Sequence, residues 1–187
     1  MKTAIIALKL FLALSITTGI IYPLAVWGYA QVFFASKAGG GLIMRGGRPL
    51  GAELIGQKFT RQEYFWARPS AADYNPLPSG GSNLSPTSRQ LLANVKAQQA
   101  KFGDGVTPDL LFSSGSGLDP HISPEAARIQ CARVAGARGI PEVDIISLVS
   151  ALTESRQFGF LGEPRVNVLR LNMKLDEKYG QRLPTRP

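Results

Sequence analysis

The chain has 187 residues, a formal net charge of +8, one histidine and one cysteine. A lone cysteine excludes an intrachain disulfide, and a single histidine far from that cysteine argues against a zinc site, so we expect no metal centre. The basic excess is scattered as single lysines and arginines, which argues against a nucleic-acid groove.

The first predicted element is a transmembrane helix over residues 10–34, after a short basic N-terminus at residues 1–9. These 25 residues carry no formal charge. As a helix they would span roughly 37 Å, against a hydrocarbon core of about 30 Å. A cleaved signal peptide is the alternative, but the apolar run exceeds the roughly 7–15 residues of a secretory apolar region. We therefore expect a retained membrane anchor.

Three residues of this helix are predicted to pack it against a neighbouring helix: Gly19, Pro23 and Gly28. Small residues let membrane helices approach closely, and a proline kink is tolerated where neighbours satisfy the freed carbonyl. Positive charges flank both ends, so they do not decide the orientation. Because long domains translocate largely regardless of charge, we expect a cytoplasmic N-terminus and an outward-facing domain.

The remainder divides into a hinge at residues 35–41, a soluble domain at 42–176 and a tail at 177–187. Three consecutive glycines close the hinge. From residue 35 on, 19 basic residues face all 13 acidic ones. This excess suits an acidic partner or anionic lipid headgroups, and also an ordinary solvated surface.

The soluble domain is predicted to begin with a hairpin of two short strands, at residues 42–44 and 54–55, separated by Gly46-Gly47 and Pro49. Residues 64–86 are dense in Pro, Gly, Ser and Asn, which predicts an irregular segment.

Three helices are expected next, each marked by its first residues. They start at Ser85-Pro86, Ser123-Pro124 and Pro141-Glu142, and the first two end at Gly103 and Gly139. Helical spacing predicts their buried faces to be Leu91, Leu92, Val95 and Phe102; Ala127, Cys131, Val134 and Ala135; and Ile145, Leu148, Val149 and Leu152.

Residues 169–176 alternate apolar and polar side chains, which favours a strand half buried against these helices, although the residue types also suit a helix. The predicted fold class is a single N-terminal transmembrane helix followed by one α+β soluble domain.

Two loops are candidate contacts for a partner or an anion. The first consists of Ser79, Gly80, Gly81, Ser82 and Asn83, whose backbone amides either form an anion-binding nest or a flexible turn before a helix.

The second loop contains Ser116, Gly117, Asp119 and His121. A serine nucleophile served by this histidine and acid would make the chain a signal-anchored envelope serine hydrolase. Against that alternative, Gly115-Ser116-Gly117 is too short for a nucleophile elbow. Turn chemistry before a helix capped by Ser123 also accounts for the loop, so we expect no catalytic residue. A phosphate-binding loop sequence is also absent, which argues against NTP hydrolysis by this chain.

A cluster of aromatic residues supplies candidate interface anchors: Tyr64, Phe65 and Trp66, together with Arg68. Packing in the core is the equal alternative.

Taken in order, several motifs closely resemble the C subunit of the bacterial Kdp potassium-transporting ATPase. They cover about residues 10–176: Tyr22-Pro23, Leu54-Ile55-Gly56-Gln57, Tyr64-Phe65, Arg68-Pro69-Ser70-Ala71, Tyr74-Asn75, Ser79 to Asn83, Ser114 to Pro124, and Leu161 to Leu169. Ala67 stands where that family usually has glycine.

The resemblance implies a non-catalytic subunit of a bacterial inner-membrane complex. Its partners would be a channel-like potassium-binding subunit, a P-type ATP-hydrolysing subunit, a small stabilising subunit and the membrane lipid. ATP and potassium ion would be handled by the complex, with no cofactor held firmly by this chain. The family is also proposed to act as a catalytic chaperone that raises the ATP affinity of the pump subunit. The phosphorylation motif of P-type pumps, Asp-Lys-Thr-Gly-Thr, does not occur here.

Overall fold

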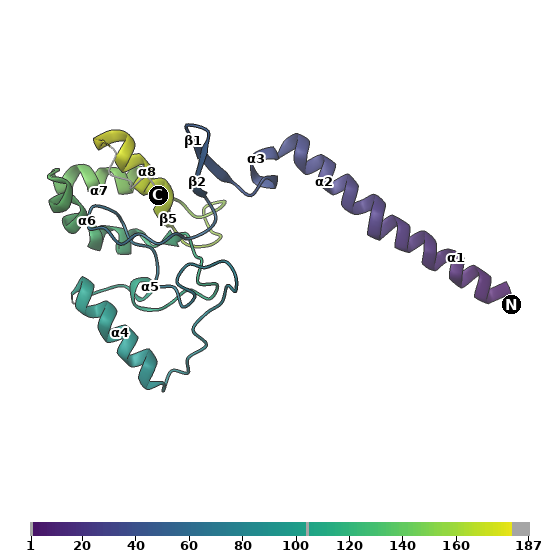
Figure 1. The fold of residues 1–187 in the computed structure, drawn as a ribbon, viewed down its shortest axis with the longest axis horizontal. Coiled ribbons are helices and arrows are strands. Elements are labelled where there is room, and N and C mark those ends of the chain that lie inside the picture. Colours follow the sequence, from purple (N-terminus) through teal and green to yellow (C-terminus); the bar gives the residue numbers. More distant parts are fainter. Residues whose placement is uncertain (1, 104, 181–187) are drawn as a thin grey trace. The chain divides into compact units, whose positions relative to one another are not determined.

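A computed structural model describes residues 2–103 and 105–180. The chain divides into two units, one ending at Leu42 and the other beginning at Ile43. Figure 1 shows a long helix in the first unit and a cluster of helices with small sheets in the second. This arrangement confirms the predicted fold class.

The first unit is a single helical run composed of α1 (Lys2–Ile16), the π-helical turn η1 (Thr17–Ile21) and α2 (Tyr22–Phe33). Its 32 residues are long and apolar enough to cross a membrane, and no part of its most apolar window is buried. The helix begins at Lys2, earlier than the predicted residue 10.

The π-helical turn lies directly before Pro23. A proline lacks an N–H and its ring clashes with the carbonyl four residues earlier, which is that of Gly19. The backbone N–H of Tyr22 donates to the carbonyl of Thr17, five residues back. A wider turn thus accommodates the proline without ending the helix.

After Phe33 the chain forms the short helix α3 (Ala35–Ala38) and then a glycine turn. Gly40 and Gly41 both have positive φ, 84° and 60°. The predicted hinge therefore contains one helical turn before its glycines.

A hairpin formed by β1 (Leu42–Arg45) and β2 (Arg48–Ala52) follows, and all of it except Leu42 belongs to the second unit. Gly46 and Gly47 connect the strands at φ 57° and 77°, which is the requirement of a type I′ turn. The second strand was predicted at residues 54–55, but these residues lie in a turn after β2. Pro49 is tolerated because a two-stranded sheet has only edge strands.

The described part of this unit also contains five helices and three short strands, joined by irregular segments. The helices are α4 (Arg89–Phe102), α5 (Pro108–Leu111), α6 (Pro124–Arg138), α7 (Glu142–Ala151) and α8 (Val168–Tyr179). The strands β3 (His121–Ile122), β4 (Thr153–Glu154) and β5 (Arg165–Asn167) form an antiparallel sheet in the order β3-β5-β4. His121 pairs with Asn167, and Thr153 pairs with Val166. Residues 64–86 contain neither helix nor strand, as predicted.

The predicted caps are confirmed for α6 and corrected for α4. Ser123 Oγ accepts a hydrogen bond from Ala126 N at 3.0 Å, and Gly139 ends α6 in the left-handed conformation. The N-cap of α4 is Ser88 rather than Ser85. Ser85 instead closes a local turn with Thr87.

The core lies between α6, α7, α8 and the three-stranded sheet. All four predicted core residues of α6 are buried, and those of α7 are buried or half-buried. Leu92 is a correction because it is 56 % exposed, whereas Leu91, Val95 and Phe102 are half-buried.

Residues 169–176 form helix α8, so the predicted strand is wrong. Val168, Leu171 and Leu175 are spaced three and four residues apart and are fully buried on one face. Asn167 caps this helix by accepting from Arg170 N at 3.0 Å.

Candidate functional site

The two predicted glycine loops pack against each other. A Cβ atom at Gly117 would lie 2.9 Å from the carbonyl oxygen of Gly80, and one at Gly81 would lie 3.0 Å from that of Gly115. Gly117 also has φ 70°, which disfavours any residue with a side chain. The glycines at these positions therefore permit close contact between two backbones, which brings residues 79–83 and 114–117 together.

A third segment joins this loop pair through Gly56, to which the sequence assigned no role beyond its place in a motif. Its N–H donates to the carbonyl of Leu118 at 2.7 Å. A Cβ atom there would lie 2.7 Å from the carbonyl oxygen of Asp119. Glycine at position 56 is thus a packing requirement of the same surface.

Arg68, Asp119 and His121 form a partly buried polar cluster beside the loops. Arg68 Nη1 lies 3.1 Å from Asp119 Oδ2, while the backbone N–H of His121 donates to Asp119 Oδ1 at 3.0 Å. The imidazole Nδ1 lies 3.7 Å from the same oxygen. Burial opposes ionisation of Asp119, but these hydrogen bonds outweigh it and hold the pKa of the carboxyl below its usual value.

The cluster lines a shallow groove of about 620 Å³. Its walls carry both charge signs, from Arg68, Asp109, Asp119, Glu125, Glu163 and Arg165, and also contain the His121 imidazole. Asp109 is already engaged, because its Oδ2 accepts from Ser123 N at 2.8 Å. Two buried polar atoms of the lining, Arg68 Nε and Thr107 Oγ1, have no hydrogen-bond partner in the described part of the chain.

The serine of the second loop is turned toward its own backbone. Ser116 Oγ accepts a hydrogen bond from Leu118 N at 3.1 Å. In the described part of the chain, no hydrogen bond joins Ser116 Oγ to His121. Asp119 meanwhile binds Arg68 and the backbone of His121. The three groups are therefore not arranged as a nucleophile, base and acid relay. Among the described residues, no group of three or more His, Cys, Asp or Glu side chains is placed to hold a metal ion.

Tyr64 and Phe65 are 1 % and 0 % exposed, so in this chain both side chains pack in the interior of the domain. Trp66 is half-buried between the Arg133 guanidinium, 3.8 Å from its ring centroid, and the Phe102 ring. Arg68 lines the groove.

Two side-chain amides hold this aromatic segment, and the sequence identified neither as a candidate site residue. Asn172 accepts from Phe65 N at 2.9 Å and donates to Phe65 O at 3.0 Å. Gln130 makes the same pair of bonds to Trp66, at 2.8 and 3.1 Å. An irregular segment thus enters the core with these backbone groups paired, as burial requires.

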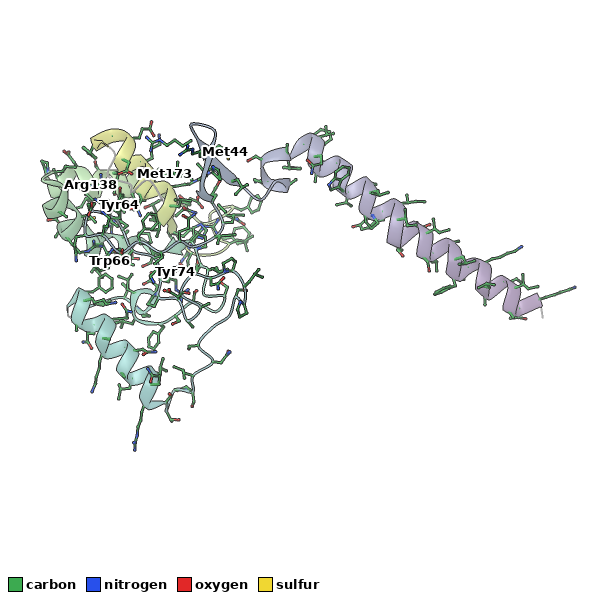
Figure 2. The ribbon with its side chains drawn as sticks, viewed as in Figure 1. Met44, Tyr64, Trp66, Tyr74, Arg138 and Met173 are labelled. Carbon is green, nitrogen blue, oxygen red and sulfur yellow. The ribbon has the colours of Figure 1, made fainter. Side chains whose placement is uncertain are left out.

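A buried ion pair anchors the beginning of the same segment. Arg138 Nη2 lies 2.8 Å from Asp176 Oδ1, and both side chains are almost completely buried. The Tyr64 hydroxyl lies 3.2 Å from the Asp176 oxygens, and its ring lies beside the guanidinium (Figure 2). Burial, reinforced by the neighbouring carboxylate, raises the pKa of Tyr64 to about 12. Burial likewise raises the pKa of the lone thiol, Cys131, to about 11, which makes it unreactive.

The predicted packing residues of the membrane helix have open space around them. A Cβ atom added at Gly19 or Gly28 meets nothing within 4 Å. Pro23 lies in the first turn of α2.

Known proteins resemble the chain over almost its full length. The family described as "KdpC: K+-transporting ATPase, c chain" matches residues 4–177. A protein of Rhodospirillum rubrum named "Potassium-transporting ATPase KdpC subunit" is 52 % identical over 182 residues, which is 92 % of this chain and 94 % of the relative. Proteins of the same name from Methylibium petroleiphilum and Leptospira interrogans are 48 % and 46 % identical, over 94 % of this chain in each case and 98 % and 94 % of the relatives. Because the family model and these relatives match almost the whole chain, including its membrane-length helix, the chain belongs to the KdpC family of potassium-transporting ATPase subunits.

Proposed function

We propose that this chain is a non-catalytic accessory subunit that assembles or stabilises an ATP-driven, high-affinity potassium import complex. The observation that carries the proposal is the exposed membrane-length helix joined to a domain in which Ser116 and Asp119 bind groups other than a catalytic partner. An apolar helix without any buried residue suits contact with lipid and other helices.

The proposed partners are a channel-like potassium-binding subunit, a P-type ATP-hydrolysing subunit, a small stabilising subunit and membrane lipid. Those subunits handle ATP and potassium ion, and this chain holds no cofactor firmly. The proposed site is the bacterial inner membrane, with the N-terminus in the cytoplasm and the second unit facing outward.

An outward-facing domain has no direct access to cytoplasmic ATP. We therefore favour docking over a direct effect on ATP affinity. In this proposal the second unit docks over the outer mouth of the channel-like subunit, where it holds the assembly together or guards ion access. The packed loops 79–83 and 114–121, together with the Arg68 groove, are the contact surface of this proposal.

The membrane helix supplies the first test. Gly28→Leu adds bulk where the isolated chain has open space, so it should clash only with a partner helix and reduce recovery of the pump subunits from mild detergent. The control Ala30→Leu lies about 200° away around the helix, at about 100° per residue, and should co-purify normally. Normal recovery of the complex with Gly28→Leu would count against the proposal.

The substitution His121→Ala distinguishes the proposed subunit from the alternative, an envelope serine hydrolase. A hydrolase would lose activity by orders of magnitude. In the proposed subunit His121 belongs to the contact surface, so His121→Ala should lower potassium uptake by no more than it lowers recovery of the complex.

A further inference from the structure

The turn between β4 and β5 exposes large apolar side chains that nothing in the described chain covers. Phe158 is 86 % exposed, Phe160 72 % and Leu161 47 %. We name residues 157–161 the aromatic turn. Scattered exposed apolar residues are ordinary, but contiguous ones on a folded domain mark an interaction site.

The aromatic turn is held in a defined shape. Gln157 N donates to Leu161 O and Leu161 N donates to Gln157 O, both at 2.9 Å. Phe158 has φ 54° and Gly159 has φ 83°. A bulky residue in the left-handed region is a genuine outlier, and the exposed Phe158 ring gains no internal packing that would offset its strain.

The charges beside the turn are paired. Arg156 Nη2 lies 2.7 Å from Glu163 Oε2, and Arg165 Nε lies 3.0 Å from Glu154 Oε2. An anionic lipid surface attracts unpaired lysines and arginines. A neutral rim around rigid aromatic side chains instead matches an uncharged, apolar pocket of a protein.

We propose that the aromatic turn docks into an uncharged apolar pocket on another subunit of the transport complex, with Phe158 and Phe160 as its anchors. This inference rests on the proposed function, because it requires a complex in which the second unit has a protein partner. Aromatic side chains buried at the centre of an interface commonly dominate its affinity.

The test uses the full chain purified with its complex. Phe158→Asn removes the ring but keeps a residue that adopts the left-handed conformation readily, so the turn should remain folded. We expect recovery of the pump subunits to fall about tenfold, as for the loss of an interface anchor, while the melting temperature of the chain stays the same or rises. Phe160→Asn should reduce recovery similarly.

The matched control is Val143→Asn, which removes a 69 % exposed apolar side chain from α7. It should leave recovery unchanged. Wild-type recovery with both Phe158→Asn and Phe160→Asn would overturn the inference.

A photo-crosslinker identifies what occupies the turn. With p-benzoyl-phenylalanine at position 160, irradiation of the complex in native membranes should give an adduct with another protein subunit. Adducts with lipid alone, or none in a complex that still co-purifies, would overturn the inference and leave the proposed function standing. Failure of the wild-type chain to co-purify with any ATPase subunit would overturn both.

Discussion

Individual polar residues determine how the aromatic segment is held in the core. Asn172 and Gln130 each satisfy one backbone N–H and one backbone carbonyl of a segment that has no strand to pair with. Each amide thereby replaces two hydrogen bonds of a sheet.

We expect Asn172→Leu to lower the free energy of unfolding by about 3 kcal/mol, because it leaves the N–H and carbonyl of Phe65 buried without partners. Urea unfolding of the full chain in detergent, followed by tryptophan fluorescence, measures this loss. Asn94→Leu on the exposed face of α4 is the control and should cost little. Equal stability of the two variants would show that the amide pairing is dispensable.

Alkaline pH should also weaken the fold at this point. Because the pKa of Tyr64 is raised from 10 to about 12, the folded state keeps a proton that the unfolded state releases. This contribution is fully present below pH 10 and is lost as the pH rises to 12, at no more than about 1.4 kcal/mol per pH unit. Tyr64→Phe should reduce the fall in unfolding free energy between pH 9 and 12. A fall as steep as that of the wild-type chain would exclude Tyr64 as its source.

The sequence predicted the apolar members of this site better than the polar ones. Core packing of Tyr64 and Phe65 was one of two interpretations that it supported. Gln130 and Asn172 carried no recognisable signal, because a polar residue on an amphipathic helix ordinarily faces solvent. Their partners are 64 and 107 residues away, so only the tertiary fold brings each pair together.

At the level of elements, the ends of α6 were predicted correctly, whereas the periodicity of residues 169–176 was misleading. Ser123-Pro124 and Gly139 delimit α6 as expected, since capping depends on local hydrogen bonds. The alternation in residues 169–176 indicated a strand, yet Leu171 and Leu175 also satisfy helical spacing. Short apolar patterns fit both periods, and packing against α7 accompanies the helix that forms.

The cap of α6 gives a prediction for this scale. Ser123→Ala should destabilise the fold by about 1 kcal/mol, because the N–H of Ala126 loses its acceptor. Ser85→Ala should cost less, since Ser85 caps no helix. Chemical unfolding of the two variants side by side makes the comparison, and a larger loss for Ser85→Ala would refute the assignment of the caps.

At the scale of the whole molecule, the membrane helix and the folded core are separate. None of the residues of α1 or α2 is buried, and every residue of the core cluster lies in the second unit. The sequence predicted the N-terminal membrane-length helix well, because a run of 25 uncharged residues is a stronger signal than any short amphipathic pattern.

A chain that starts at Ile43 should therefore fold in aqueous buffer without the helix. Circular dichroism should show helical content, and its urea midpoint should match that of the full chain in detergent within the error of the measurement. An unfolded or aggregated product would show that the first unit contributes to the core.

The aromatic segment has a consequence for how the protein is made. The Phe65–Asn172 bonds join residues 107 positions apart, and the Tyr64–Asp176 bonds join residues 112 positions apart. During synthesis, Phe65 therefore leaves the ribosome long before Asn172 and Asp176 are added to the chain. The nascent domain therefore cannot complete these bonds until the residues of α8 have been synthesised.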